Sequence, residues 1–171
     1  GADGKQKWQH NTVYGPGAAA VATVPDGSGK RLVAFGCVDG TVQVVRPPRE
    51  QGPDKRAEVA FVLRTGDRIT GLAGGEANLL VASANNSVYA VGVDGGIRWR
   101  ARLADTPRYL WESNGRVVVL GDGGSLTVLD GEGQVVRVVD LGGDVRPASY
   151  LAAEGLVVGG RPGGMLQAWK A

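Results

Sequence analysis

Residues 88–99 read VYAVGVDGGIRW, and this phrase decides how the rest of the chain is interpreted. It begins as a strand-like run, continues into a turn at Asp94-Gly95-Gly96, and carries Trp99 five residues after Asp94. Gly adopts positive φ without strain and an Asp side chain hydrogen-bonds to nearby backbone, so both favour tight turns. The phrase therefore predicts two antiparallel strands joined by a short turn, with Trp99 on the second strand. A shortened version, ADGKQKW, occupies residues 2–8.

The composition is that of a globular protein. A chain of 171 residues with 43% apolar residues is long enough and apolar enough to bury a core. Its 29 glycines are scattered without a period of three, which excludes collagen. The net charge of +2 does not call for a nucleic acid or an anionic membrane as partner. The sequence contains no apolar run long enough to span a membrane and no visible signal peptide, so it leaves the cellular compartment open.

The secondary-structure pattern is almost entirely β. Four Val-rich segments each contain a central pair of turn-forming residues and are predicted to be hairpins: residues 32–45, 79–91, 117–130 and 156–169. Strand candidates precede them at residues 18–24, 69–75, 108–113 and 145–153, and others follow at residues 58–65, 97–103 and 134–141. The hairpins start 47, 38 and 39 residues apart, and repeats of roughly 40–50 residues with four strands are typical of propellers. The Pro-rich, charged segment 46–57 is interpreted as a surface insertion.

The predicted fold is therefore an all-β propeller of four four-stranded antiparallel blades. We expect one domain over residues 1–171, with repeat units at residues 12–65, 66–103 and 104–141, and a fourth at residues 142–171 plus 1–11.

The opening phrase resembles the repeat of PQQ-like propellers, the quinoprotein alcohol dehydrogenase-like family. In that family a strand ending like YAV leads through an Asp-Gly turn to a strand whose Trp packs between neighbouring blades. The resemblance implies this packing role for Trp8 and Trp99, and Phe61 offers the corresponding aromatic in the first unit. WD40 propellers are the near rival, but neither their Gly-His nor their Trp-Asp signature is found.

The two ends of the sequence are complementary. The chain stops after MLQAWKA, one strand short of a blade, and it begins with ADGKQKWQHN, which matches the missing strand. We therefore expect residues 5–11 to complete the last blade. Three arrangements remain open: a closed four-blade ring, an eight-blade ring of two chains that exchange terminal strands, or a segment of a larger propeller.

Catalytic constellations are mostly absent from the sequence. A single histidine, His10, excludes a multi-histidine metal site within the chain. The dehydrogenases of the PQQ-like family bind PQQ with a metal ion and a vicinal disulfide, which a chain with Cys37 as its one cysteine cannot form. The resemblance therefore extends to the scaffold and not to the activity. We expect no enzymatic activity and no cofactor, and Cys37 is expected to be a buried, inert thiol.

The leading functional hypothesis is a non-catalytic interaction scaffold or sensor domain that binds a protein or peptide. Arg98, Arg100 and Arg102 alternate along one predicted strand and form a candidate basic rim for an acidic partner. An alternative is a sensor for a small ligand or carbohydrate, with Tyr109 and Trp111 stacking on the ligand. A degenerate quinoprotein dehydrogenase is the remote alternative.

Overall fold

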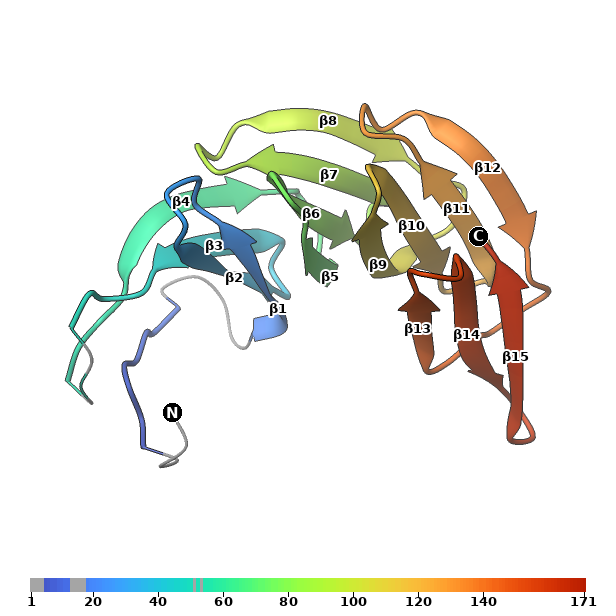
Figure 1. The fold of residues 1–171 in the computed structure, drawn as a ribbon, viewed down its shortest axis with the longest axis horizontal. Coiled ribbons are helices and arrows are strands. Elements are labelled where there is room, and N and C mark those ends of the chain that lie inside the picture. Colours follow the sequence, from blue (N-terminus) through green and yellow to red (C-terminus); the bar gives the residue numbers. More distant parts are fainter. Residues whose placement is uncertain (1–4, 13–17, 51, 53) are drawn as a thin grey trace.

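The chain folds into four antiparallel sheets that follow one another along an open arc (Figure 1). The structure is a computed structural model, and it describes residues 5–12, 18–50, 52 and 54–171. Within these residues there is no helix, and the all-β fold class predicted from the sequence is confirmed. No described segment forms a helix that could cross a membrane.

Each sheet consists of strands that are consecutive in the chain, and we call the sheets blades 1 to 4. Blade 1 contains β1 (Ala18–Pro25), β2 (Arg31–Cys37), β3 (Thr41–Arg46) and β4 (Glu58–Arg64). Blade 2 contains β5 (Ile69–Gly74), β6 (Asn78–Ser83), β7 (Ser87–Gly92) and β8 (Ile97–Arg102). Blade 3 contains β9 (Pro107–Ser113), β10 (Arg116–Gly121), β11 (Ser125–Leu129) and β12 (Val135–Asp140). Blade 4 has three strands, β13 (Ala148–Leu151), β14 (Leu156–Arg161) and β15 (Met165–Lys170).

The four predicted hairpins are the pairs formed by the second and third strands of the four blades. Their turns place Gly40, Asn86 and Gly124 at φ values of 83°, 59° and 88°, in the left-handed region that short hairpin turns require. Asn is among the few residues other than Gly that tolerate this region, which explains why the sequence has Asn85-Asn86 at one of these turns.

The hydrophobic core is divided into three clusters, one between each pair of neighbouring blades. Val-rich strands with both faces apolar suit this arrangement, because the central strands of a blade pack against a neighbour on each side. In β6, for example, Leu79 and Val81 pack against blade 1, while Leu80 and Ala82 pack against blade 3. All four are at most 1% exposed.

The structure does not show the expected closure of the last blade. Residues 5–12, which we call the N-terminal arm, lie beside the β3–β4 connection of blade 1, where Gln9 forms a parallel bridge with Arg56. Among the described residues no strand pairs with the free edge of β15. Asp3 and Gly4, which belong to the shortened phrase, lie outside the described residues. Figure 1 shows the arm at one end of the arc and β15 at the other.

Candidate functional site

A basic pocket lies at the edge of blade 1, between the β1–β2 turn and the start of the β3–β4 connection. It is a hollow of about 800 Å³. The lining residues come from these two segments and include four cationic side chains and one carboxylate: Asp26, Ser28, Lys30, Arg31, Arg46, Pro47, Pro48 and Arg49.

The β1–β2 side of the pocket is held by a turn around Asp26. Its carboxylate accepts hydrogen bonds from the backbone N–H of Ser28 at 2.8 Å and of Lys30 at 3.1 Å, and from the Ser28 hydroxyl at 2.8 Å. The Ser28 hydroxyl and the two backbone donors keep the pKa of Asp26 below its ordinary value. Asp26 therefore stays ionised, and its charge interacts with that of Arg46. One carboxylate against four cationic side chains leaves the lining of the pocket net positive.

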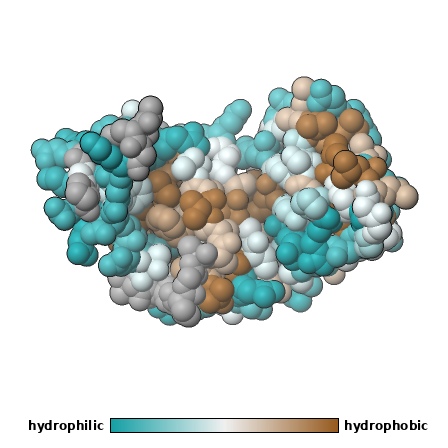
Figure 2. All heavy atoms as spheres, turned by 90° about the horizontal axis from the view of Figure 1, so that it is seen from below, coloured by the Kyte–Doolittle hydropathy of each residue, from teal (hydrophilic) through white to brown (hydrophobic). Residues whose placement is uncertain are grey.

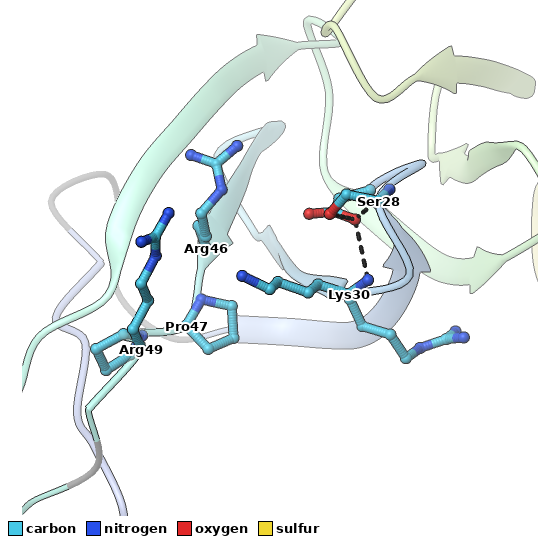
Figure 3. A pocket seen from close by; sticks show the side chains of 8 residues that line it. Ser28, Lys30, Arg46, Pro47 and Arg49 are labelled. Atoms are coloured by element: carbon cyan, nitrogen blue, oxygen red, sulfur yellow. Dashed lines mark hydrogen bonds between the residues drawn. The ribbon is translucent and has the colours of Figure 1, made fainter.

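The cationic side of the pocket is shown in Figure 3, where the side chain of Lys30 extends between Ser28 and Pro47 towards the β3–β4 connection. Arg46 is the last residue of β3, and Arg49 lies three residues further on in that connection, with Pro47 and Pro48 between them. Arg46 lies 3.8 Å from Glu58, and both side chains are largely exposed, so this ion pair is weak. Arg31 is held by Thr23, to which its guanidinium donates two hydrogen bonds of 2.9 Å.

Sequence reasoning identified the insertion 46–57 but not the pocket. The missing partner was the turn of residues 26–30, because nothing in the sequence indicates that a turn some 20 residues away faces the insertion. Arg46 and Arg49 were visible as charges, whereas their approach to Lys30 depends on where the β1–β2 turn and the end of β3 lie in blade 1.

The predicted packing residues lie at the outer side of the arc. The indole Nε1 of Trp99 on β8 donates a hydrogen bond of 2.8 Å to the carbonyl of Gly131, in the β11–β12 turn of blade 3. A Cβ added to Gly133 in the same turn would lie 2.6 Å from the indole ring. Phe61 on β4 lies in the same way over Gly95 of blade 2, where an added Cβ would be 2.9 Å from its ring. Trp8 lies half-buried in the N-terminal arm.

The three predicted rim arginines are exposed on β8, but two of them have local partners. Arg98 forms an ion pair of 2.9 Å with Asp94. Arg100 lies over the ring of Tyr89, 5.3 Å from its centroid, and donates hydrogen bonds to Ser87. The strand register shifts beside Arg98, so the regular alternation expected from the sequence holds only for Arg100 and Arg102.

Tyr109 and Trp111 lie on β9 and stack with their centroids 5.8 Å apart. Both are half-buried against the core shared by blades 3 and 4. There the ring of Trp111 also lies beside that of Tyr150, with the ring centroids 6.1 Å apart. Tyr109 borders a second hollow of about 430 Å³, together with Arg108 and Asp122, which form an ion pair of 2.8 Å.

The described residues hold no cluster of three or more His, Cys, Asp or Glu side chains placed to bind a metal ion. Cys37 is fully buried, and this burial raises the pKa of its thiol.

Comparisons with known proteins show similarity in structure but not in sequence. No protein-family model and no curated protein matches the chain. The computationally designed protein Ika4 superposes with a TM-score of 0.74 at 18% identity, over 98% of both chains. The computationally designed Ika8 superposes with a TM-score of 0.69 at 19% identity, over 90% of this chain and 46% of Ika8. Sqt1 of Saccharomyces cerevisiae, a WD40 protein, gives a TM-score of 0.68 at 16% identity, over 81% of this chain and 44% of Sqt1.

The chain thus spans about half the length of Ika8 and of Sqt1. At these identities the likeness concerns the fold alone. Designed propellers and a WD40 protein are therefore the structures that the four consecutive antiparallel sheets of this chain match. The chain has a β-propeller fold.

Proposed function

We propose that this chain is a non-catalytic propeller module that binds an acidic peptide segment of a partner protein at the basic pocket of blade 1. The PQQ-like repeat phrase supports a scaffold of that family's type, without its cofactor chemistry. The single observation that carries the proposal is the meeting of Lys30, Arg46 and Arg49 around one solvent-open hollow whose lining holds a single carboxylate, so that positive charge is in excess.

The chemistry of the pocket favours carboxylate groups as ligands. Arg presents a planar fork of donors that matches a carboxylate, and Lys adds a mobile point charge. A hollow of about 800 Å³ that is open on one side accepts several residues of an extended chain. Pro47 and Pro48 restrict the backbone between the two arginines and so reduce the conformational entropy lost on binding.

The insertion that carries these arginines is specific to blade 1. The corresponding β7–β8 and β11–β12 connections are tight turns closed by backbone hydrogen bonds between Gly92 and Gly96 and between Asp130 and Gln134. A long insertion in one of several similar repeats is typical of a binding loop carried on a rigid scaffold.

The test is titration of a fluorescein-labelled peptide rich in Glu and Asp, followed by fluorescence anisotropy. Replacing both arginines (Arg46→Gln with Arg49→Gln) is expected to weaken binding about tenfold, since each exposed charge pair contributes roughly 0.7 kcal/mol. The matched control is Arg116→Gln with Arg137→Gln, which removes the same charge from exposed strand positions outside both the pocket and the predicted arginine rim. Equal weakening by both double variants would show that the peptide responds to net charge and would refute the pocket.

A second candidate is a small-ligand or carbohydrate sensor. It is favoured by Tyr109, whose ring borders the hollow of about 430 Å³ and is backed by Trp111. A panel of sugars and metabolites screened by thermal shift tests it. A ligand whose shift is lost in Tyr109→Ala would support the sensor, and a panel without any shift would reject it.

A further inference from the structure

The two ends of the arc expose faces of opposite kind. We call the face of a blade that is turned towards the next blade in the chain its forward face. We call the face that is turned towards the preceding blade its backward face. The forward face of blade 4 and the backward face of blade 1 have no neighbouring blade within the described chain.

The forward face of blade 4 carries apolar side chains at positions that are buried in the other blades. The strand registers make Val42, Val88, Leu126 and Leu166 equivalent positions of the third strand. The first three are 0% exposed because each lies under the next blade, whereas Leu166 is 75% exposed. Figure 2 shows hydrophobic side chains gathered at the right-hand end of the molecule, where blade 4 lies.

The backward face of blade 1 is partly open: Gln43 and Val45 on β3 are buried, but their neighbours on β2 are less covered. Val33 and Phe35 on β2 are equivalent to Leu79 and Val81 on β6 by register. The pair on β6 is at most 1% exposed because blade 1 covers it, while Val33 and Phe35 are only half-buried. An apolar forward face and an apolar backward face are the two halves of each junction that already exists within the chain.

The N-terminal arm already occupies the place of a preceding blade's fourth strand. Within the chain, Phe61 and Trp99 extend from the fourth strand of one blade to the connection between the third and fourth strands of the next. The arm has the same relation to blade 1. The backbone N–H of Gln9 donates to the carbonyl of Lys55 at 3.0 Å, within the β3–β4 connection.

Side-chain contacts agree with this assignment. The equal Asp-to-Trp spacing of the two phrases aligns Trp8 with Trp99 and His10 with Ala101. Ala101 points forward into the core shared with blade 3. His10 likewise stacks on Phe35 of blade 1, with ring centroids 6.1 Å apart.

We propose that two copies of this chain join head to tail into one ring. The forward face of blade 4 of each copy packs on the backward face of blade 1 of the other, and each N-terminal arm pairs with β15 of the other copy as the fourth strand of its blade 4. Two arcs related by a twofold axis form both junctions identically and leave no open end. One arc does not close on itself, because its three internal junctions leave its ends apart (Figure 1).

Sedimentation equilibrium of the whole chain tests the proposal. The parent chain is expected to have twice the 17.7 kDa mass of one copy. Leu166→Glu should raise the dimer dissociation constant on the order of 1000-fold, because it removes a buried leucine from each of two junctions. Since Leu166 is exposed in a single arc, this variant is expected to keep its β circular dichroism. The matched control is Val138→Glu, at a position that is 57% exposed on β12 and lies outside both junctions. It should remain dimeric.

Three results would overturn the proposal. A monomeric parent chain would mean that no second copy covers the ends. A species larger than two copies would mean that the junctions do not close by twofold symmetry. A Leu166→Glu variant as dimeric as the Val138→Glu control would show that the copies meet through another surface.

Discussion

The contact of Trp99 with the β11–β12 turn gives the sharpest prediction for stability. Trp99→Ala should lower the free energy of unfolding by about 3 kcal/mol, the low end for Trp→Ala, because the indole is half-buried. Trp99→Phe should cost about 1 kcal/mol, since it removes mainly the hydrogen bond to Gly131. An alanine at Gly133 would have to adopt a left-handed conformation, which by itself lowers the free energy of unfolding by roughly 1–2 kcal/mol. Gly133→Ala should lower it further, because the new Cβ would lie 2.6 Å from the indole ring of Trp99.

In the double variant the clash disappears, since Trp99→Ala removes the ring that the new Cβ would meet. The two costs should therefore fall short of additivity by about 1 kcal/mol or more. The assay is guanidinium unfolding followed by far-ultraviolet circular dichroism, with all variants at one protein concentration because association adds to the measured stability. Gly66→Ala is the control, because Gly66 has φ of 84° and nothing within 4 Å of an added Cβ. Two double-mutant cycles are compared, one pairing Trp99→Ala with Gly133→Ala and the other pairing Trp99→Ala with Gly66→Ala. If the changes in unfolding free energy are as additive in the first cycle as in the second, the contact between Trp99 and Gly133 is refuted.

Three other predictions follow from burial and from the proposed absence of cofactor chemistry. Burial, together with the nearby charge of Glu76, raises the pKa of Glu112 above its ordinary value of 4.5. The folded state therefore binds the Glu112 proton more tightly than the unfolded state does. The contribution of Glu112 to stability falls as the pH rises above 4.5. Glu112→Gln should therefore raise the melting temperature more at pH 7 than at pH 4.5, and an equal effect at both would contradict this. The Cys37 thiol, buried and with a raised pKa, should react with a thiol reagent at pH 7 only in denaturant; rapid reaction of the native chain would argue against the burial. Addition of PQQ and Ca²⁺ should leave no bound-cofactor absorbance after gel filtration, and retained absorbance would revive the quinoprotein alternative.

Much of the fold could be predicted from the sequence because its signals are local. Val-rich runs and turn pairs such as Asn85-Asn86 define each hairpin within about a dozen residues, and the spacing of the hairpins indicates four blades. The position of Trp99 after the Asp94 turn likewise depends only on neighbouring residues.

The remaining features depend on contacts between distant segments, to which a single sequence gives no direct access. The basic pocket requires Lys30 to face Arg46 across the end of blade 1. The position of the N-terminal arm depends on whether it meets β15 of its own chain, as expected from the sequence, or lies beside the β3–β4 connection at the other end of the arc. The sequence indicated only that the arm matches a fourth strand, and the contact of Gln9 with Lys55 shows which connection it lies against.

Disulfide trapping of the arm on β15 tests the head-to-tail ring most directly. In blade 2, Arg100 on the fourth strand lies opposite Tyr89 on the third strand. Gln9 is equivalent to Arg100, and Gln167 is equivalent to Tyr89. Gln9 of one copy should therefore lie opposite Gln167 of the other. Opposed Cα atoms about 4.5–5.5 Å apart permit a disulfide.

In a Cys37→Ala background, Gln9→Cys with Gln167→Cys should give a covalent dimer on a non-reducing gel, and Gln9→Cys with Gln134→Cys should not. A covalently joined dimer of the first variant alone is the predicted result. A chain that stays monomeric, whether unlinked or joined within itself, would contradict the ring.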